Sequence, residues 1–386
     1  MPPKILVSAG EASGDLYASE LVTALRESWP DAEFFGCAGP RMRAAGVRAV
    51  VDSANLAVVG LVEVLSHVPG IYREFRKLVS AAKRERPALA ILTDSPDFHL
   101  RLAKKLKRLG IPVIYLIAPQ VWAWRQGRVR QMRRNLNKLL CIFPFEKKFF
   151  ETHGIPVEYL GHPLTRIVRP NTSKDAFFRK HGIDGSRPVI TLLPGSRIGE
   201  VARHLPPLSL AAALLKQEHG ATLILAVPAG FSDKAGLNFF GERISGAPIQ
   251  IVEGQTWDAI AHADMVIAAS GTVTIEAALL GAPMVTFYRV TPVSWLLGKL
   301  LLRVPFYSMV NLVAERRIVP ELMQREATGE NLAHAAGMLL TNPAARQAMQ
   351  RDLAEVTAKL QTREDPMQRA AEVVGRILKK ELKHGL

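Results

Sequence analysis

The feature that most constrains this fold is a repeated alternation of short apolar runs with helical patterns. Apolar runs such as KILVSAG (4–10), ALAILTD (88–94) and PVITLLPG (188–195) are separated by segments such as FHLRLAKKLKRLG (98–110), whose apolar residues recur at helical spacing. The runs are continuous, which is typical of strands buried on both faces of a parallel sheet. The alternation therefore predicts an α/β fold.

The alternation occurs in two blocks, divided by the polar stretch TRIVRPNTSKD (165–175). We therefore expect two Rossmann-like, doubly wound domains, 1–168 and 169–342. From about Pro343 the pattern is purely helical. Because these helices have no strand of their own to cover, we expect 343–386 to pack on the first domain of the same chain or of a partner chain.

Charge and composition restrict the partners. Hydrophobic residues make up 48% of the chain and charged residues 22%, with a formal net charge of +15. The composition is that of a globular protein, and the charge predicts a polyanionic partner: nucleic acid, an anionic membrane surface or phosphorylated substrates. The two cysteines, Cys37 and Cys141, have no metal-ligand spacing, which indicates buried thiols in a reducing cytosol and argues against structural zinc.

The chain shows no targeting or membrane-spanning pattern. The N-terminal run ILVSAG is too short for a signal peptide and leads into Glu11 and Asp15. No apolar run reaches about 18 uninterrupted residues. We expect a protein that is soluble or lies on a membrane.

Polar clusters follow the predicted strands, where open parallel sheets bind their ligands. The six clusters are GEASGD (10–15), DSPD (94–97), PQVWAW (119–124), GHP (161–163), PGSR (194–197) and SGTVTIE (270–276).

Two of these clusters predict an anion site on the second domain. SGTVTIE places hydroxyls and backbone N–H groups at a helix start, which suits a diphosphate, and Glu276 could bind a ribose diol. PGSR adds a tight turn, a hydroxyl and Arg197, whose guanidinium suits phosphate. The alternatives are a plain N-cap for the first cluster and a surface arginine in the second.

The first cluster resembles a dinucleotide fingerprint but lacks the G-x-G-x-x-G spacing, and Glu11 would face the pyrophosphate. A loop with carboxylates better suits sugar hydroxyls or proton transfer. DSPD lacks the spacing of a DxD metal motif, so we expect neither a metal nor a cofactor. The negative charge of a bound diphosphate would then be balanced by Arg197 and helix N-termini.

The motifs together resemble those of the lipid-A-disaccharide synthase family. GEASGD, GPRM, VVGLVEVL, DSPDF, APQVWAWR, FPFEKKFF, GHPL, LLPGSR, ASGTVTIEAALLGAPMV and NLVAERRIVPELMQ occur in that family's order over nearly the whole chain. The resemblance implies an inverting GT-B glycosyltransferase, peripheral on the cytoplasmic face of the inner membrane. It would join UDP-2,3-diacylglucosamine to 2,3-diacylglucosamine 1-phosphate, giving a β-1,6-linked disaccharide phosphate and UDP. A homodimer through the C-terminal helices is also open.

The loops and the resemblance together assign substrate residues. The residues expected around the UDP-sugar are Gly195, Ser196, Arg197, Ser270, Gly271, Thr272, Thr274 and Glu276, with Asn311 and Gln324 as further neighbours. Those expected in the acceptor cleft of the first domain are Ser13, Asp15, Asp94, Gln120 and Trp122.

Transfer to a primary hydroxyl needs a general base. We expect Asp97 in this role, because it follows Pro96 at a helix start within DSPDF; the alternative is an N-cap. Glu11 is the second candidate and His162 a possible orienter. Asp94 directly ends its strand, where backbone N–H groups would depress its pKa and weaken it as a base.

The segment 61–79 predicts a membrane-contacting helix. It combines apolar and basic residues, namely Leu61, Leu65, Val68, Ile71, Arg73, Arg76 and Lys77, as interfacial elements do. The alternative is an amphipathic helix that covers the sheet. The basic run 125–138 after WAW leaves nucleic acid as a rival partner, and acyl chains on both substrates favour the membrane. A lipid-linked N-acetylglucosaminyltransferase or a UDP-sugar 2-epimerase is the alternative enzyme.

Overall fold

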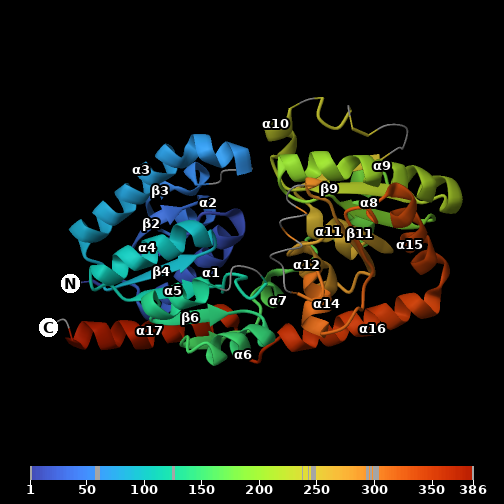
Figure 1. Ribbon diagram of the computed structural model, residues 1–386. Helices are drawn as coiled ribbons and strands as arrows, with labels where there is room; N and C mark the ends of the chain where they lie inside the picture. The colour runs from blue at the N-terminus through green and yellow to red at the C-terminus, as the bar shows by residue number, and fades with distance from the viewer. Residues whose placement is uncertain are drawn as a thin grey trace. The chain divides into compact units, whose positions relative to one another are not determined.

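The computed structural model describes residues 2–56, 61–123, 127–236, 238–241, 243–244, 249–292, 295, 298 and 304–384, without the side chains of 61–68 and 384. The chain forms two compact units (Figure 1). The first combines the residues up to Pro163 with those from Leu360 onward, and the second runs from Leu164 to Lys359.

The first unit contains a seven-stranded parallel sheet in the order β3-β2-β1-β4-β5-β6-β7. Its strands are β1 (Lys4–Ser8), β2 (Glu33–Ala38), β3 (Arg48–Asp52), β4 (Leu89–Thr93), β5 (Val113–Leu116), β6 (Lys138–Cys141) and β7 (Val157–Tyr159). Its helices are α1 (Ala12–Ser28), α2 (Pro40–Ala44), the 3-10 turn Ser53–Asn55, α3 (Leu61–Glu85), α4 (Pro96–Arg108), α5 (Arg128–Asn135), α6 (Pro144–Thr152) and α17 (Pro366–His384).

The second unit contains a six-stranded parallel sheet in the order β10-β9-β8-β11-β12-β13. Its strands are β8 (Val189–Leu193), β9 (Thr222–Val227), β10 (Ile249–Glu253), β11 (Met265–Ala269), β12 (Met284–Tyr288) and β13 (Glu321–Met323). Its helices are α7 (Leu164–Ile167), α8 (Lys174–His181), α9 (Ile198–His219), α10 (Phe231–Ala235), α11 (Thr256–Ala261), α12 (Val273–Leu279), α14 (Met309–Ala314), α15 (Gly329–Thr341) and α16 (Pro343–Leu360).

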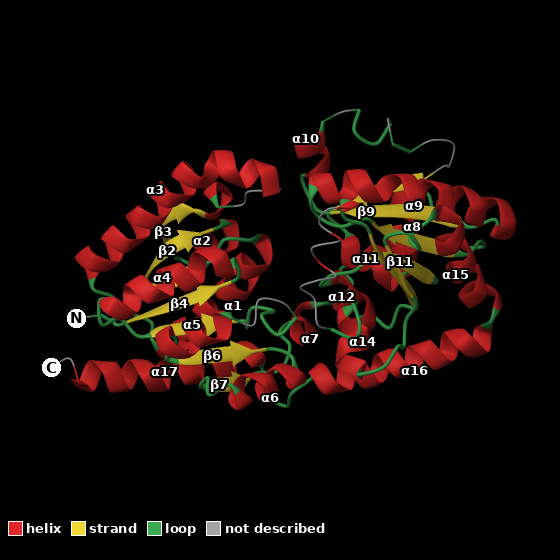
Figure 2. Ribbon diagram, viewed as in Figure 1, coloured by secondary structure: helices red, strands yellow, loops and turns green. Residues whose placement is uncertain are grey.

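Both sheets are buried between helices, as Figure 2 shows. Every residue of β4, β8 and β11 is buried, which explains why these strands appear in the sequence as unbroken apolar runs. The prediction of two doubly wound α/β domains is confirmed.

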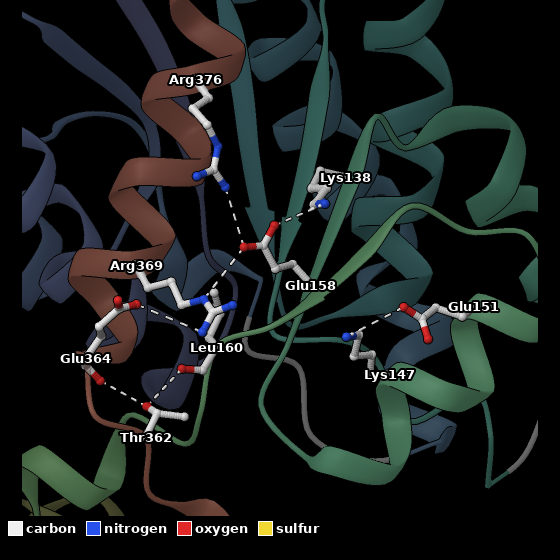
Figure 3. A network of polar contacts seen from close by, with 9 residues as sticks. All are labelled: Lys138, Lys147, Glu151, Glu158, Leu160, Thr362, Glu364, Arg369 and Arg376. Atoms are coloured by element: carbon white, nitrogen blue, oxygen red, sulfur yellow. Dashed lines mark hydrogen bonds and ion pairs between the residues drawn. The ribbon is translucent and has the colours of Figure 1, made fainter.

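The C-terminal helix α17 packs on α1 of its own chain. Its apolar face, which includes Val374 and Leu378, is buried. On its polar side Arg369 and Arg376 lie 3.6 and 3.5 Å from Glu158 of β7, which also pairs with Lys138 (Figure 3). Hydrophobic burial with an ion-pair network thus fixes this helix to the first unit.

The preceding helix, α16, belongs instead to the second unit. Arg316 lies 2.9 Å from both Asp352 and Glu355 of α16, and the sulfur of Met349 contacts the backbone of Met284. The expectation that both C-terminal helices pack on the first domain is therefore wrong for α16. An amphipathic helix without a strand of its own does not reveal which sheet it covers.

Candidate functional site

Four of the six polar clusters lie at the topological switch points of the two sheets. The strand order reverses between β1 and β4 in the first unit and between β8 and β11 in the second. Ligands of open α/β sheets bind outside the carboxyl ends of the strands at such points. GEASGD and DSPD flank the first switch point, and PGSR and SGTVTIE flank the second.

Asp94 bridges the loops at the switch point of the first sheet. Its carboxylate accepts hydrogen bonds from the backbone N–H groups of Gly10 (2.9 and 3.1 Å) and Glu11 (3.0 Å). A Cβ atom on Gly14 would lie 1.7 Å from Oδ2 of Asp94, and one on Gly10 would lie 2.6 Å from Oγ of Ser95. The glycines of GEASGD therefore make room for the Asp94–Ser95 turn.

The expected low pKa of Asp94 is wrong, although the expected hydrogen bonds are present. Burial raises the pKa of Asp94 to about 7, and the N–H groups of Gly10 and Glu11 only partly offset that rise. Desolvation thus outweighs hydrogen bonding at this carboxyl.

The backbone beside Asp94 is strained. Asp94 (φ 54°) and Ser95 (φ 34°) are left-handed, as is Ile117 (φ 62°) after the adjacent strand β5. A left-handed residue other than glycine costs about 1–2 kcal/mol. Such strain gathers at functional sites, where surrounding contacts hold it in place.

Asp97 and Glu11 present exposed carboxylates at this switch point. The side chain of Asp97 is 65% exposed and forms an ion pair with Arg128 of α5. The N-cap position of α4 is Ser95, so Asp97 does not occupy it. Glu11 and Ser13 are exposed at the start of α1, and the Glu11 side chain does not cap that helix.

Asp15 has a structural position instead of a place in the acceptor cleft. It is buried, and its carboxylate accepts hydrogen bonds from the backbone N–H groups of Gly39 (2.9 Å), Arg41 (2.9 Å) and Met42 (3.1 Å). Asp15 therefore caps the start of α2 from α1.

His162 is fully buried beside the ring of Phe143, 5.2 Å away between centroids. Burial lowers the pKa of His162 to about 3, so the ring is neutral at physiological pH.

Trp122 is also buried, while Gln120 in the same loop is exposed. The indole Nε1 of Trp122 donates a hydrogen bond of 3.0 Å to Glu146, whose other oxygen accepts from the N–H groups of Ile142 and Phe143. Burial raises the pKa of Glu146 to about 7. Trp122 therefore fastens the loop after β5 to the start of α6.

In the second unit, the loop after β8 presents Ser196 and Arg197 to solvent. Gly195 has φ 113°, and a Cβ atom there would lie 2.4 Å from Oε2 of Glu200. The same oxygen accepts the backbone N–H of Ser196 at 3.2 Å. Glycine is therefore required at this turn, both by the backbone conformation and by the close carboxylate.

His204 joins this loop to the loop after β12. Its Nδ1 lies 2.7 Å from the carbonyl oxygen of Pro194, and the N–H of Arg289 lies 3.1 Å from its Nε2. Burial lowers the pKa of His204, so the neutral ring donates from Nδ1 and accepts at Nε2.

The loop after β11 exposes Gly271 and Thr272. The hydroxyl of Ser270 donates to the carbonyl oxygen of Tyr307 (2.8 Å). The buried hydroxyl of Thr274 donates to the carbonyl oxygen of Gly271 (2.8 Å). Thr274 thus stabilises the loop from within.

Glu276 is partly buried, and its Oε2 accepts a hydrogen bond of 2.8 Å from Nε1 of Trp257 on α11. Burial raises the pKa of Glu276.

Asn311 and Gln324 use their amides within the protein. Asn311 is fully buried, donates to Val319 and Glu321, and accepts from the N–H groups of Ile318 and Val319. Gln324 pairs with the backbone of Val290 through both its amide oxygen (2.6 Å) and its amide nitrogen (2.9 Å). The two side chains therefore hold backbone segments of the second unit in place, Asn311 at Ile318 and Val319 and Gln324 at Val290.

The expected membrane element, 61–79, forms all but the last six residues of α3 (Leu61–Glu85). The side chains of Leu61, Leu65 and Val68 lie outside the described residues. Ile71 is partly exposed, and Tyr72 is 61% exposed. The second half of the helix buries residues such as Leu78 against the unit, so its packing there matches the covering-helix alternative.

Basic side chains continue along the exposed face of α3. Arg73, Arg76 and Lys77 are exposed, and buried Glu74 lies 3.3 Å from Arg73 and 2.9 Å from Lys77. A hollow of about 460 Å³ opens here, lined by Val50, Pro69, Tyr72, Arg73, Arg76, Lys77, Ser80, Ala81 and Arg84.

The sequence analysis missed several polar residues behind the loops, namely the buried His99, Glu146 and His204 and the partly buried Glu200 and Trp257. The sequence pattern could have identified His99 and His204, because each is a polar residue on the buried face of the helix that directly follows a strand-end cluster.

The described ranges contain neither a metal-ligand cluster nor a membrane-spanning helix. Among those residues, no group of three or more His, Cys, Asp and Glu side chains is arranged to hold a metal ion. No described helix is both long and apolar enough to cross a bilayer.

Comparison with known proteins shows the fold class and the family. Among solved structures, a UDP-GlcNAc 2-epimerase from Neisseria meningitidis bound to UDP-GlcNAc has a TM-score of 0.64 at 13% identity, covering 98% of this chain and 100% of that one. The glycotransferase of kitacinnamycin has a TM-score of 0.64 at 16% identity, covering 97% and 99%. At such identities the likeness shows the fold alone.

Sequence relatives are much closer. The lipid-A-disaccharide synthase of Solibacter usitatus is 58% identical over 382 residues, 99% of this chain and 99% of that protein. The lipid-A-disaccharide synthase of Myxococcus xanthus is 42% identical over 359 residues, 93% and 94%. A protein-family profile described as Lipid-A-disaccharide synthetase (LpxB) matches residues 5–374. The chain therefore belongs to the lipid-A-disaccharide synthase family, glycosyltransferases that transfer a sugar from a UDP-sugar donor to a sugar-phosphate acceptor and so form the lipid A disaccharide.

Proposed function

We propose that the second unit binds the UDP group of UDP-2,3-diacylglucosamine at the β8–β11 switch point. Exposed Arg197 and Ser196 on one side, and exposed Gly271 and Thr272 on the other, offer a guanidinium, hydroxyls and N–H groups to a diphosphate. Glu276 would bind the ribose. The identity of the acyl groups on the donor follows from the family resemblance.

The first unit would bind 2,3-diacylglucosamine 1-phosphate, with Asp97 as the general base. The observation that carries this assignment is a difference in exposure. Asp15 is buried, the side chain of Asp94 is only 11% exposed, and both are hydrogen-bonded to backbone N–H groups, whereas Asp97 is exposed on the first turn of a regular helix. A base must reach the proton that it removes. Glu11, also exposed, is the second candidate.

In the proposed step, the primary hydroxyl of the acceptor attacks the anomeric carbon of the donor. The hydroxyl proton passes to Asp97 as the new C–O bond forms. The bond from the anomeric carbon to UDP breaks, and UDP leaves with the electron pair. Arg197 and the N–H groups of its loop would stabilise the charge that develops on the diphosphate.

Kinetics of an alanine variant test this assignment. Asp97→Ala should lower kcat by about 10²–10⁴ with little change in the KM for the UDP-sugar, since general-base catalysis contributes about that much. Asp175→Ala is the matched control, because Asp175 is an exposed aspartate in the first turn of α8. Near-normal turnover in Asp97→Ala, beside collapse in Glu11→Ala, would transfer the role to Glu11.

We also propose that the basic face of α3 contacts an anionic membrane, on the cytoplasmic face of the inner membrane. Arg73, Arg76 and Lys77 are exposed next to Tyr72, and each basic side chain near an anionic surface contributes about 1 kcal/mol. Acyl chains on both substrates require access to a lipid phase.

A homodimer through the C-terminal helices stays a proposal. In this structure α17 packs on α1 of its own chain, and the same contacts could be made by the helix of a partner chain. Sedimentation of the full chain against a variant lacking residues 361–386 would test this arrangement.

A further inference from the structure

A buried polar cluster lies behind the turn that carries Asp97, and neither proposed substrate site uses it. Ser8, His99 and Tyr115 are fully buried and come from β1, α4 and β5. Nδ1 of His99 lies 3.0 Å from the carbonyl oxygen of Asp94, and the hydroxyl of Tyr115 donates to the same oxygen at 2.5 Å. One backbone carbonyl therefore accepts two side-chain hydrogen bonds.

The protonation of His99 follows from its neighbours. A carbonyl oxygen can only accept, so Nδ1 carries the proton. Burial lowers the pKa of His99 to about 4, so the ring is neutral and Nε2 accepts from the hydroxyl of Ser8, 2.8 Å away. Ser8 thus holds His99 in the tautomer that donates to Asp94.

The carbonyl of Asp94 controls the direction of the chain at this point. It belongs to the peptide group between Asp94 and Ser95, the two consecutive left-handed residues. Fixing that peptide plane fixes ψ of Asp94 and φ of Ser95. The carbonyl of Ser95 then accepts the N–H groups of Phe98 and His99 (3.0 Å each), which starts α4. Asp97 lies within this first turn.

We infer that His99 and Tyr115 are positioning residues for the glycosyl transfer, holding the Asp94–Ser95 turn so that Asp97 faces the acceptor hydroxyl. This inference rests on the proposed role of Asp97. The two donors hold a backbone conformation that residues with a Cβ atom otherwise avoid. Removing one donor lets the peptide plane rotate and displaces Asp97, and a misplacement of about 1 Å can cost on the order of 100-fold in rate.

Three variants separate positioning from packing. Tyr115→Phe removes one hydroxyl. His99→Leu removes the second donor, whereas His99→Asn keeps an N–H group near the place of Nδ1. Tyr115→Phe and His99→Leu should each lower kcat about 10-fold, with the KM values of both substrates within about 2-fold, and His99→Asn should recover most of the loss. Tyr159→Phe, at a half-buried tyrosine on β7, is the matched control and should leave kcat unchanged.

A double-mutant cycle with Asp97→Ala completes the test. If Tyr115 acts through Asp97, adding Tyr115→Phe to Asp97→Ala should lower kcat no further. A full additional 10-fold loss in the double variant would overturn the inference. So would normal kcat in Tyr115→Phe beside a strong loss in Asp97→Ala, an outcome that leaves the proposed function standing. Near-normal turnover in Asp97→Ala itself would overturn both.

Discussion

Replacing Gly14 by alanine should destabilise the first unit, against the usual effect of this change in a helix. Gly14 lies inside α1, where alanine is favoured over glycine by about 1 kcal/mol. The added Cβ atom, however, would lie 1.7 Å from Oδ2 of Asp94. Contacts this short do not occur, so the carboxylate of Asp94 must move.

The magnitude follows from what Asp94 loses by moving. Its oxygens accept from the N–H groups of Gly10 and Glu11, and each hydrogen bond to a charged or partly charged acceptor contributes about 1–3 kcal/mol. Two lost partners, offset by the gain of about 1 kcal/mol in helix propensity, leave a net loss of about 1–5 kcal/mol. For a unit of this size, Tm should fall by roughly 2–20 °C.

Thermal unfolding of Gly14→Ala and Gly70→Ala makes the comparison. Gly70 also lies inside a helix of the first unit, α3, and a Cβ atom there would meet no described atom within 4 Å. Gly70→Ala should therefore keep Tm unchanged or raise it slightly. A Tm for Gly14→Ala equal to that of the wild type, together with unchanged kcat, would show that the position of Asp94 does not depend on this close contact.

Four further outcomes are expected. Glu276→Ala should raise the KM for the UDP-sugar far more than that for the acceptor, and equal changes would remove Glu276 from the donor site. The pKa of Glu146 in the folded protein is raised to about 7, so between about pH 4.5 and 7 the native state keeps a proton that the unfolded chain has lost. The free energy of unfolding should therefore fall by up to about 3 kcal/mol as the pH rises through this range. Urea titrations at several pH values should show that the free energy of unfolding depends less on pH in Glu146→Gln than in the wild type. Replacing Arg76, which is exposed, by glutamate should weaken salt-sensitive binding to phosphatidylglycerol vesicles without lowering Tm, and equal binding by wild type and variant, or tight binding of RNA, would contradict the membrane proposal. Deleting the residues after Leu360 should expose the face of α1 that α17 covers, and a stable, active truncated protein would contradict that packing role.

The fold could be predicted from sequence because its strands are buried on both faces. The boundaries between the two units were harder to predict from the sequence. They fall at 163/164 and 359/360 instead of 168/169 and 342/343. Helix α7 packs against α12, and buried Asp258 accepts the backbone N–H groups of Asn171 and Thr172. These contacts join the supposed linker to the second unit, and no local pattern encodes them.

The rule that open parallel sheets bind ligands at the carboxyl ends of their strands located the loops but not the orientation of each side chain. It placed Asp97, Glu11 and Arg197 at exposed positions, where the structure also has them. It equally favoured Asp15, and the family resemblance favoured Asn311, but both are buried and hydrogen-bonded within the protein. An acid that caps a neighbouring helix and an acid that faces a ligand look alike in sequence, because the difference depends on residues far away in the chain.

The division of the first unit has a consequence for how the protein is made. The second unit is one continuous segment, whereas the first also needs α17, which follows the whole second unit in the sequence. At about 5–20 residues per second, the roughly 200 residues between Pro163 and α17 take about 10–40 s to synthesise. During that interval the surface of α1 that α17 will cover, beside Trp29, stands open on the nascent chain. The second unit can therefore be folded before the first has all of its residues, and α17, which is synthesised after the second unit, completes a domain whose strands were made before it.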